Sequence, residues 1–309
     1  MTTMPVVLHC KTDNVRVIAD VLGTIALKKH QTAICTVTEA GLKVTVQSGK
    51  ALQASALLRE ALFHSYSFNT NEGSTQVFHL DLTLFLNCIG LASMCDTNAG
   101  SGSFTMMQMQ YVGAGHPLQL LLEDNGVLTE CTIATLEPEA HSLLDFGFKA
   151  VPTRNNVIMM SDPLREAFTE MQALDKFVQV HITIAPSDVS QTGIGEPCLR
   201  LFANGSASQM EVQLTVDSEA FFKFECTAQV SQTYNLKFVK ATLPALTASK
   251  EVRLRINDYG LLSLVAVITT EDEQIRTYVE YIISPEDDGA TEFDQEELEQ
   301  EGDNNIEGP

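Results

Sequence analysis

The stretch TDNVRVIADVLGTIAL, residues 12–27, has apolar side chains at the spacing of an amphipathic helix. Ile18, Val21 and Leu22 would lie on its buried face. A second stretch of the same kind, DPLREAFTEMQAL, occupies residues 162–174, about 150 positions later. The two stretches therefore predict helices at matching places in two halves of the chain.

Three further pairs of segments are separated by nearly the same distance along the chain. One pair has helical spacing, and two pairs have the apolar content of strands. The pairs are Asp81–Ala92 with Gln232–Leu243 for the helices, and Leu118–Leu122 with Leu262–Val267 and Val127–Ile133 with Ile275–Ile283 for the strands. Solenoid repeats have periods of about 20–50 residues, so this longer spacing indicates a duplicated domain.

Much of the remaining chain alternates between apolar and polar residues and is interrupted by turn signals. Glu39-Ala40-Gly41, Asp124-Asn125-Gly126 and Asp258-Tyr259-Gly260 are typical of hairpins. Antiparallel strands joined by such turns, with two helices in each half, predict the α+β class. We expect two similar domains, each an antiparallel sheet with two helices packed on one face.

The predicted domains are residues 1–134 and 157–285, joined by a connecting loop at 135–156. Residues 286–309 follow with eleven of the chain's 40 acidic residues and no Lys or Arg. This segment has few bulky apolar side chains, so we expect a disordered acidic tail. The tail could be a solubilising extension, or it could keep nonspecific nucleic acid away.

The cysteine pattern and the apolar runs limit the class of protein. The seven cysteines form no C-x-x-C pair, and their odd number argues against a disulfide scaffold. A reducing compartment is therefore expected. No apolar run approaches the length of about 18 residues that a membrane span needs, and no secretory signal pattern is present. We expect no membrane partner.

The sequence has none of the common catalytic patterns. It contains no phosphate-binding loop, no G-x-S-x-G elbow, and no H-x-H or H-E-x-x-H spacing. A two-metal nuclease needs converging carboxylates, but no D-x-E pair lies inside an apolar strand. Asp81 is better explained as a helix cap. The sequence therefore predicts no catalytic residues, no metal site and no cofactor.

Basic residues gather in and beside the predicted helices, although the chain is acidic overall. They could be ordinary solvated helix surface, or they could show that the helices meet a polyanion. Lys237 and Lys240 share one solvent-facing side of their helix. The candidate set is Lys11, Arg16, Lys28, Lys29, Arg165, Lys176, Lys237 and Lys240.

Several segments, in order, resemble the sliding-clamp fold of PCNA. They are Ser74–Met94, Phe146-Gly147-Phe148, Lys240-Ala241-Thr242 and Tyr281-Ile282-Ile283-Ser284-Pro285. Leu86 and Ile89 stand on the second helix where replicative clamps carry lysines. Together with the opening LHCKTDNVRVIADVLGTI, this departure makes the chain resemble most the Rad-one subunit family of the checkpoint clamp.

The resemblance implies a ring subunit that acts in the nucleus on DNA damage. Two paralogous subunits would complete a heterotrimer, a clamp loader would open it, and double-stranded DNA would pass through it next to the basic residues. Repair and checkpoint proteins would bind the ring. Subunits would join through sheet edges formed by Val127, Leu128, Thr129, Glu130 and Cys131 on one side and Met210, Val212 and Leu214 on the other.

The resemblance also implies a pocket for partner peptides between the connecting loop and the last strand. Its expected residues are Phe146, Phe148, Ile282 and Pro285, with Val44 and Leu52 nearby. The alternative is that Phe146 and Phe148 only fix the loop to the body. Three other functions stay open: a metal-dependent 3′–5′ exonuclease, a homotrimeric replicative clamp, and a sheet-based interaction module with no DNA role.

Overall fold

The chain folds into two halves with the same order of strands, and the second half has two short helices where the first has one longer helix. The computed structural model describes residues 6–69, 75–93, 106–124, 126–136, 146–174, 177–186, 199–215, 217–269 and 275–286. The first half comprises β1 (Leu8–Thr12), α1 (Val15–Thr24), β2 (Thr32–Thr38), β3 (Gly41–Ser48), β4 (Leu52–Arg59), the 3₁₀ helix η1 (Glu60–Leu62), β5 (Ser65–Phe68), β6 (Gln76–Asp81), α2 (Leu82–Ser93), β7 (Met106–Tyr111), β8 (Leu118–Asp124) and β9 (Val127–Ile133).

The second half repeats this order after the 3₁₀ helix η2 (Phe148–Ala150), which lies in the connecting segment, residues 146–154. It comprises β10 (Asn155–Met160), α3 (Ser161–Leu174), β11 (Gln179–Ile184), β12 (Leu199–Asn204), β13 (Gln209–Leu214), β14 (Phe221–Cys226), β15 (Val230–Asn235), α4 (Leu236–Lys240), α5 (Leu243–Ala248), β16 (Glu251–Ile256), β17 (Leu262–Thr269) and β18 (Arg276–Ile283).

The sheets repeat in the same way. The strand order β5-β1-β7-β8-β9 of the first half matches β14-β10-β16-β17-β18 of the second, and β4-β3-β2-β6 matches β13-β12-β11-β15. Every named strand pair is antiparallel, so the predicted α+β class is confirmed.

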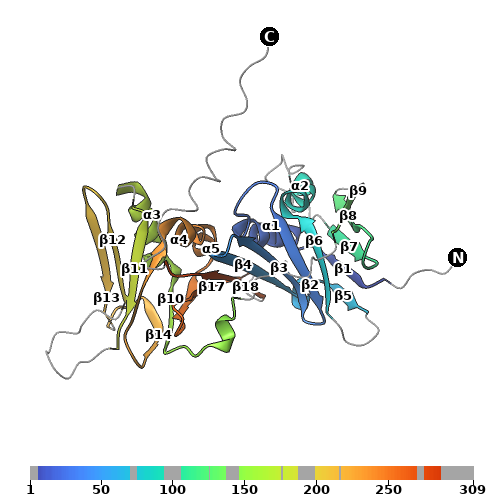
Figure 1. The fold of residues 1–309 in the computed structure, drawn as a ribbon. Helices are drawn as coiled ribbons and strands as arrows, with labels where there is room; N and C mark the ends of the chain where they lie inside the picture. Colours follow the sequence, from blue (N-terminus) through green and yellow to red (C-terminus); the bar gives the residue numbers. More distant parts are fainter. Residues whose placement is uncertain are drawn as a thin grey trace, which may run out of the picture.

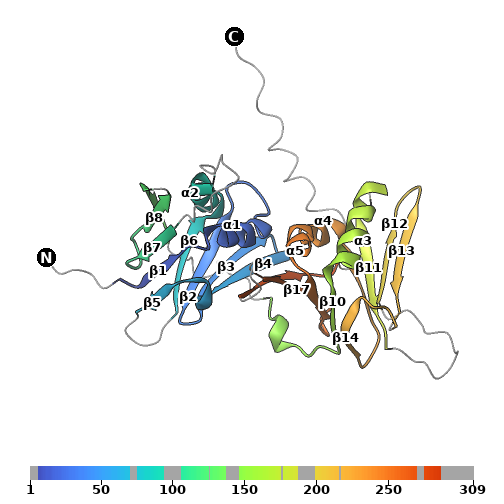
Figure 2. The ribbon, with the colours of Figure 1, turned by 180° about the vertical axis from the view of Figure 1, so that it is seen from behind.

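One strand pair joins the halves. β18 pairs with β4, from Tyr278 opposite Leu57 to Ile283 opposite Leu52. The pairing makes one nine-stranded sheet, the central sheet, with the order β14-β10-β16-β17-β18-β4-β3-β2-β6. In Figures 1 and 2 the helices lie on one side of this sheet, which we call the helical face. The connecting segment lies on the other side, the outer face.

The core lies between the sheets and the helices. Ile18, Val21 and Leu22 of α1 are 0–1% exposed, as the helical spacing predicts. The helix itself begins at Val15, because Thr12 belongs to β1 and its hydroxyl accepts a hydrogen bond from the backbone N–H of Asn14 at 2.9 Å. Similarly, α3 begins at Ser161, so Asp162 lies in its first turn and is not its N-cap.

The prediction of a helix over Gln232–Leu243 was wrong at both ends. Residues up to Asn235 belong to β15, which pairs with β11. Asn235 then caps α4, because its side-chain oxygen accepts from the backbone N–H of Lys237 at 3.0 Å. Pro244 lies in the first turn of α5, where its missing N–H costs nothing, and so does not end the preceding helix.

A buried hydrogen bond adds to the joint between the halves. The hydroxyl of Tyr281 on β18 donates to the carbonyl of Thr24 on α1 at 2.7 Å. Tyr281→Phe should lower the free energy of unfolding by about 1–3 kcal/mol, because the buried carbonyl loses this donor. Urea denaturation would measure the change. Tyr278→Phe, on the same strand but 36% exposed, is the control and should change stability by less than about 0.5 kcal/mol.

The buried tyrosines also predict a loss of stability at high pH. Burial raises the pKa of Tyr234 and of Tyr281 above the usual value of about 10. The unfolded chain therefore loses these protons at a lower pH than the folded chain does. Stability should hold below about pH 10 and fall above it. Urea midpoints between about pH 9 and 11 would test this, and Tyr281→Phe should show the smaller fall.

Candidate functional site

A groove of about 630 Å³ lies on the helical face where the two halves meet. Ala26 and Leu27, just after α1, line it from the first half, and Phe238 and Pro244 line it from the second. Lys237 and Lys240 of α4 also line it. We call this feature the inner groove.

Four of the predicted DNA-facing lysines lie in or beside the inner groove. Lys28 and Lys29 directly follow Leu27 and are exposed, as is Lys237, while Lys240 is half-buried. Within the part of the chain that the structure describes, none of the four has an ion-pair partner. Their charges are therefore available to an anion.

The other predicted cations are placed differently. Arg16 pairs with Asp20 at 4.0 Å on α1, and Arg165 pairs with Asp162 at 2.9 Å on α3. Lys11 lies on the face of β1 opposite the buried Leu8, Cys10 and Thr12, so the structure does not bring it to the groove. Lys176 lies outside the described residues.

The second helix carries no charge on its described surface. Asp81 caps it as predicted, accepting from the backbone N–H of Leu84 at 2.9 Å. Ile89 is only 1% exposed and belongs to the core, whereas Leu84 is 46% exposed. Of the two apolar residues noted in the sequence, only the half-buried Leu86 contributes to the surface of α2.

Among the outermost strands of the three sheets, in the part of the chain that the structure describes, are β9 and β13. β9 is the outermost strand of the first-half sheet, and its Val127 and Leu128 are 64% and 63% exposed. β13 is the outermost strand of the second-half sheet, and its residues alternate between exposed and half-buried. Both contain the residues predicted for subunit contacts: Val127, Leu128, Thr129, Glu130 and Cys131 in β9, and Met210, Val212 and Leu214 in β13.

These two edges correspond to the two strands that join the halves. By position in the repeat, β9 is the counterpart of β18, and β13 is the counterpart of β4. Since β18 pairs with β4 inside the molecule, β9 of one molecule and β13 of a related one are suited to the same antiparallel pairing. The edges lie at opposite ends of the molecule (Figure 1).

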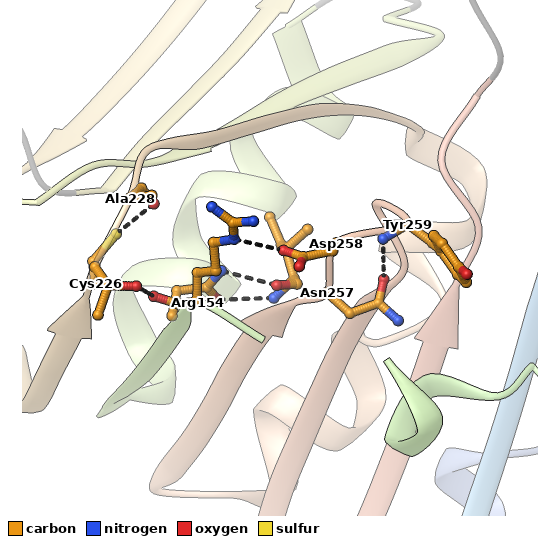
Figure 3. Close-up of polar contacts among 9 residues, drawn as sticks. Arg154, Cys226, Ala228, Asn257, Asp258 and Tyr259 are labelled. Carbon is orange, nitrogen blue, oxygen red and sulfur yellow. Dashed lines mark hydrogen bonds and ion pairs between the residues drawn. The ribbon is translucent and has the colours of Figure 1, made fainter. Parts of the chain in front are cut away.

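The connecting segment is tied to the second half at its end. Arg154 Nε donates to Asp258 Oδ1 at 2.9 Å (Figure 3). The backbone N–H of Thr227 donates to the Arg154 carbonyl at 2.9 Å. The backbone N–H of Asp258 donates to the Pro152 carbonyl at 3.1 Å. This end of the loop is therefore fixed to the turn between β16 and β17.

Phe148 fixes the same segment to the outer face of the central sheet. Its ring is 3% exposed, and the Arg255 guanidinium carbon lies 5.0 Å from the ring centroid. Burial lowers the pKa of Arg255, whose Nη2 lies 3.9 Å from Glu280 Oε1. The geometry favours a role for Phe148 in holding the loop to the body, with the half-buried Phe146 and Pro285 nearer the surface.

Val44 and Leu52 cannot line a pocket under the connecting segment. Both are at most 2% exposed and point into the core on the helical side, because side chains alternate along β3 and β4. Their strand neighbours Thr45 and Gln53 take the outer face instead. Ile282 does lie on that face, opposite Gln53, but is only 8% exposed.

A row of apolar side chains crosses the outer face and was not found from the sequence. Consecutive register pairs connect Met160, Glu251, Val267, Tyr278 and Leu57 across five strands. Met160 is 39% and Tyr278 36% exposed, while Val267 and Leu57 are half-buried. We call the four apolar residues the outer row. The sequence signal for this row would have been the position of Tyr278, which lies on the side of its strand opposite the buried residues.

The thiols and carboxylates show no reactive arrangement in the described residues. Burial raises the pKa of Cys10 and of Cys35 to about 12, so both stay protonated near neutral pH. Within the same residues, no group of three His, Cys, Asp or Glu side chains could hold a metal ion.

No described helix is long and apolar enough to cross a membrane.

Comparison with solved structures gives the class of the fold. PCNA from Thermococcus kodakaraensis superposes with a TM-score of 0.67 over 90% of this chain and 100% of that chain, at 16% identity. The molecule thus has the sliding-clamp fold.

Sequence comparison gives the family. The family described as "Repair protein Rad1/Rec1/Rad17" matches residues 7–268. The "Cell cycle checkpoint protein RAD1" of Mus musculus is 34% identical over 276 residues, covering 89% of this chain and 91% of that protein. The chain therefore belongs to the Rad1 family. The "DNA repair exonuclease REC1" of Mycosarcoma maydis is 28% identical over 188 residues, covering 53% of this chain and 40% of that protein.

Proposed function

We propose that the protein is one subunit of a heterotrimeric checkpoint clamp, loaded on DNA at damage sites in the nucleus, where it is a platform for checkpoint signalling and repair proteins. The observation that carries the proposal is the equivalence of the open edges β9 and β13 to the internal joint of β18 with β4. Contacts of this head-to-tail kind close into a ring when the rotation between subunits allows it.

The helical face would surround the DNA. Lys28, Lys29, Lys237 and Lys240 offer positive charge there that no described residue pairs, and the paired Arg16 and Arg165 offer less. Lysines reach phosphates without reading bases, so binding would be independent of sequence and sensitive to salt. A small number of such lysines gives weak binding, which suits a ring that must slide along DNA.

The outer row would serve as the platform. Tyr278→Glu should leave ring assembly and DNA binding intact but reduce capture of repair and checkpoint proteins by about 10–100-fold, because a buried aromatic contact is worth about 1.5–3 kcal/mol. Quantitative mass spectrometry of proteins bound from nuclear extract would measure this. The control is Tyr259→Glu, at a residue 74% exposed in the β16–β17 turn. Equal capture by both variants would exclude the outer row.

Light-scattering mass tests the assembly. The purified chain should have a mass near 33.8 kDa alone and form a complex near 100 kDa with two paralogous subunits, about three chains of this size. A homotrimer of this chain alone would instead support a replicative clamp. A monomer in both samples would favour an interaction module that forms no ring.

The exonuclease alternative has one observation in its favour, the name of the Mycosarcoma maydis relative. A metal-dependent nuclease needs clustered carboxylates, and the described residues contain no such group. Magnesium-dependent shortening of DNA 3′ ends by the pure protein, abolished by a single Asp or Glu substitution, would establish it.

A further inference from the structure

The last described residue is bound at the rim of the inner groove. The backbone N–H of Glu286 donates to the Thr233 carbonyl at 2.8 Å, and its Oε1 accepts from Asn235 Nδ2 at 2.8 Å. Gln179 Nε2 donates to its other carboxylate oxygen. Asn235 lines the inner groove and caps the helix that carries Lys237 and Lys240. The chain therefore continues beyond residue 286 from a point beside these lysines.

The inner groove combines positive charge with apolar surface. None of the described residues that line it is acidic, while Lys237 and Lys240 are both basic. Its apolar lining includes Val178, which is 61% exposed, and the half-buried Phe238. An occupant that matches this lining would be an acidic peptide with occasional bulky apolar side chains.

The sequence that follows Glu286 has this composition. Residues 287–309, the acidic segment, contain ten acidic residues, no Lys or Arg, and the apolar Phe293, Leu298 and Ile306. Because the segment is tethered at the groove rim, its effective concentration there would be about millimolar. Even a weak dissociation constant of about 0.1 mM would then keep the groove occupied in about nine molecules out of ten.

We propose that the acidic segment folds back into the inner groove and competes with DNA for Lys237 and Lys240. The competition rests on the proposed DNA role of the helical face, but the docking itself does not. A segment that holds the lysines until a continuous duplex displaces it would suppress weak, nonspecific contacts. Neutralising the segment should tighten DNA binding about ten-fold, because the groove would otherwise be free in only about one molecule in ten.

Zero-length carbodiimide cross-linking of the full chain tests the docking. This reagent joins carboxylates to lysine amines, and mass spectrometry identifies the linked pairs. At low salt, links from the acidic segment to Lys237 and Lys240 should exceed those to Lys43 and Lys149, two exposed lysines on the outer face, by at least about ten-fold. The excess should vanish at about 0.5 M salt. Equal yields at all four lysines would overturn the proposal.

Binding of duplex DNA by the assembled ring tests the competition. The matched variant keeps the full length but carries Gln or Asn at the ten acidic positions of the segment. Tighter binding by this variant at low salt supports competition, and unchanged binding overturns it. If neither ring binds DNA, the proposed DNA role fails, while the cross-linking result still decides whether the segment docks.

Discussion

Replacing Val127 and Leu128 by glutamate should leave a folded chain that no longer joins one of its two neighbours. These side chains are 64% and 63% exposed on β9, so the isolated chain loses little by the change. In a ring they would be buried, and each is worth about 1.5–3 kcal/mol. Losing both should weaken that junction by about 10²–10⁴-fold. Light-scattering mass of mixtures with each paralogous subunit would measure it.

A second edge variant makes the test directional. Met210→Glu on β13 should break the other junction, so the two variants should each lose a different paralogous subunit and keep the other. The control is Tyr259→Glu with Phe222→Glu, at residues 74% and 60% exposed away from both edges. If both edge variants lost the same neighbour, or neither did, the head-to-tail arrangement would be refuted.

The elements that the sequence predicted well are those decided by local periodicity. The buried stripe of α1 and the strands β8, β9 and β17 follow patterns that neighbouring residues alone determine. Gln232–Leu243 was mistaken for a helix because pairing with β11, more than 45 residues earlier in the chain, decides its first part. Pairing between strands distant in the chain can override the local preference for helix, and neighbouring residues do not reveal it.

The candidate site also combines features that the local sequence could indicate with features that depend on the folded chain. The i,i+4 spacing of Arg16 with Asp20 and the i,i+3 spacing of Asp162 with Arg165 could have indicated from sequence that these arginines have ion-pair partners. The alternation of apolar and polar residues in Leu42–Gln47 and Leu52–Ser55 could likewise have indicated that Val44 and Leu52 face the core. The outer row and the inner groove combine residues more than 200 positions apart, which only the folded chain brings together.

Reversing Lys237 and Lys240 to glutamate should reduce the affinity of the assembled ring for duplex DNA by about 10²-fold or more near 0.1 M salt. Each lysine that neutralises a phosphate contributes about 0.9 to the slope of log affinity against log salt, so the slope should fall by about 2. Fluorescence anisotropy of labelled duplexes at several salt concentrations would measure both quantities. Two duplexes of unrelated sequence should give the same result, since phosphate contacts do not depend on the bases.

The matched control separates local contact from net charge. Lys43→Glu with Lys149→Glu changes the total charge by the same amount but acts on the outer face, where both residues are exposed. Equal losses in the two double variants would mean that only the overall charge matters and would remove the inner groove from the DNA path. Replacing Lys237 and Lys240 by glutamate also removes the proposed partners of the acidic segment. Neutralising that segment should therefore tighten DNA binding in the native ring. It should have little effect in the ring that carries Lys237→Glu and Lys240→Glu. That non-additivity is the sign that DNA and the acidic segment use the same two lysines.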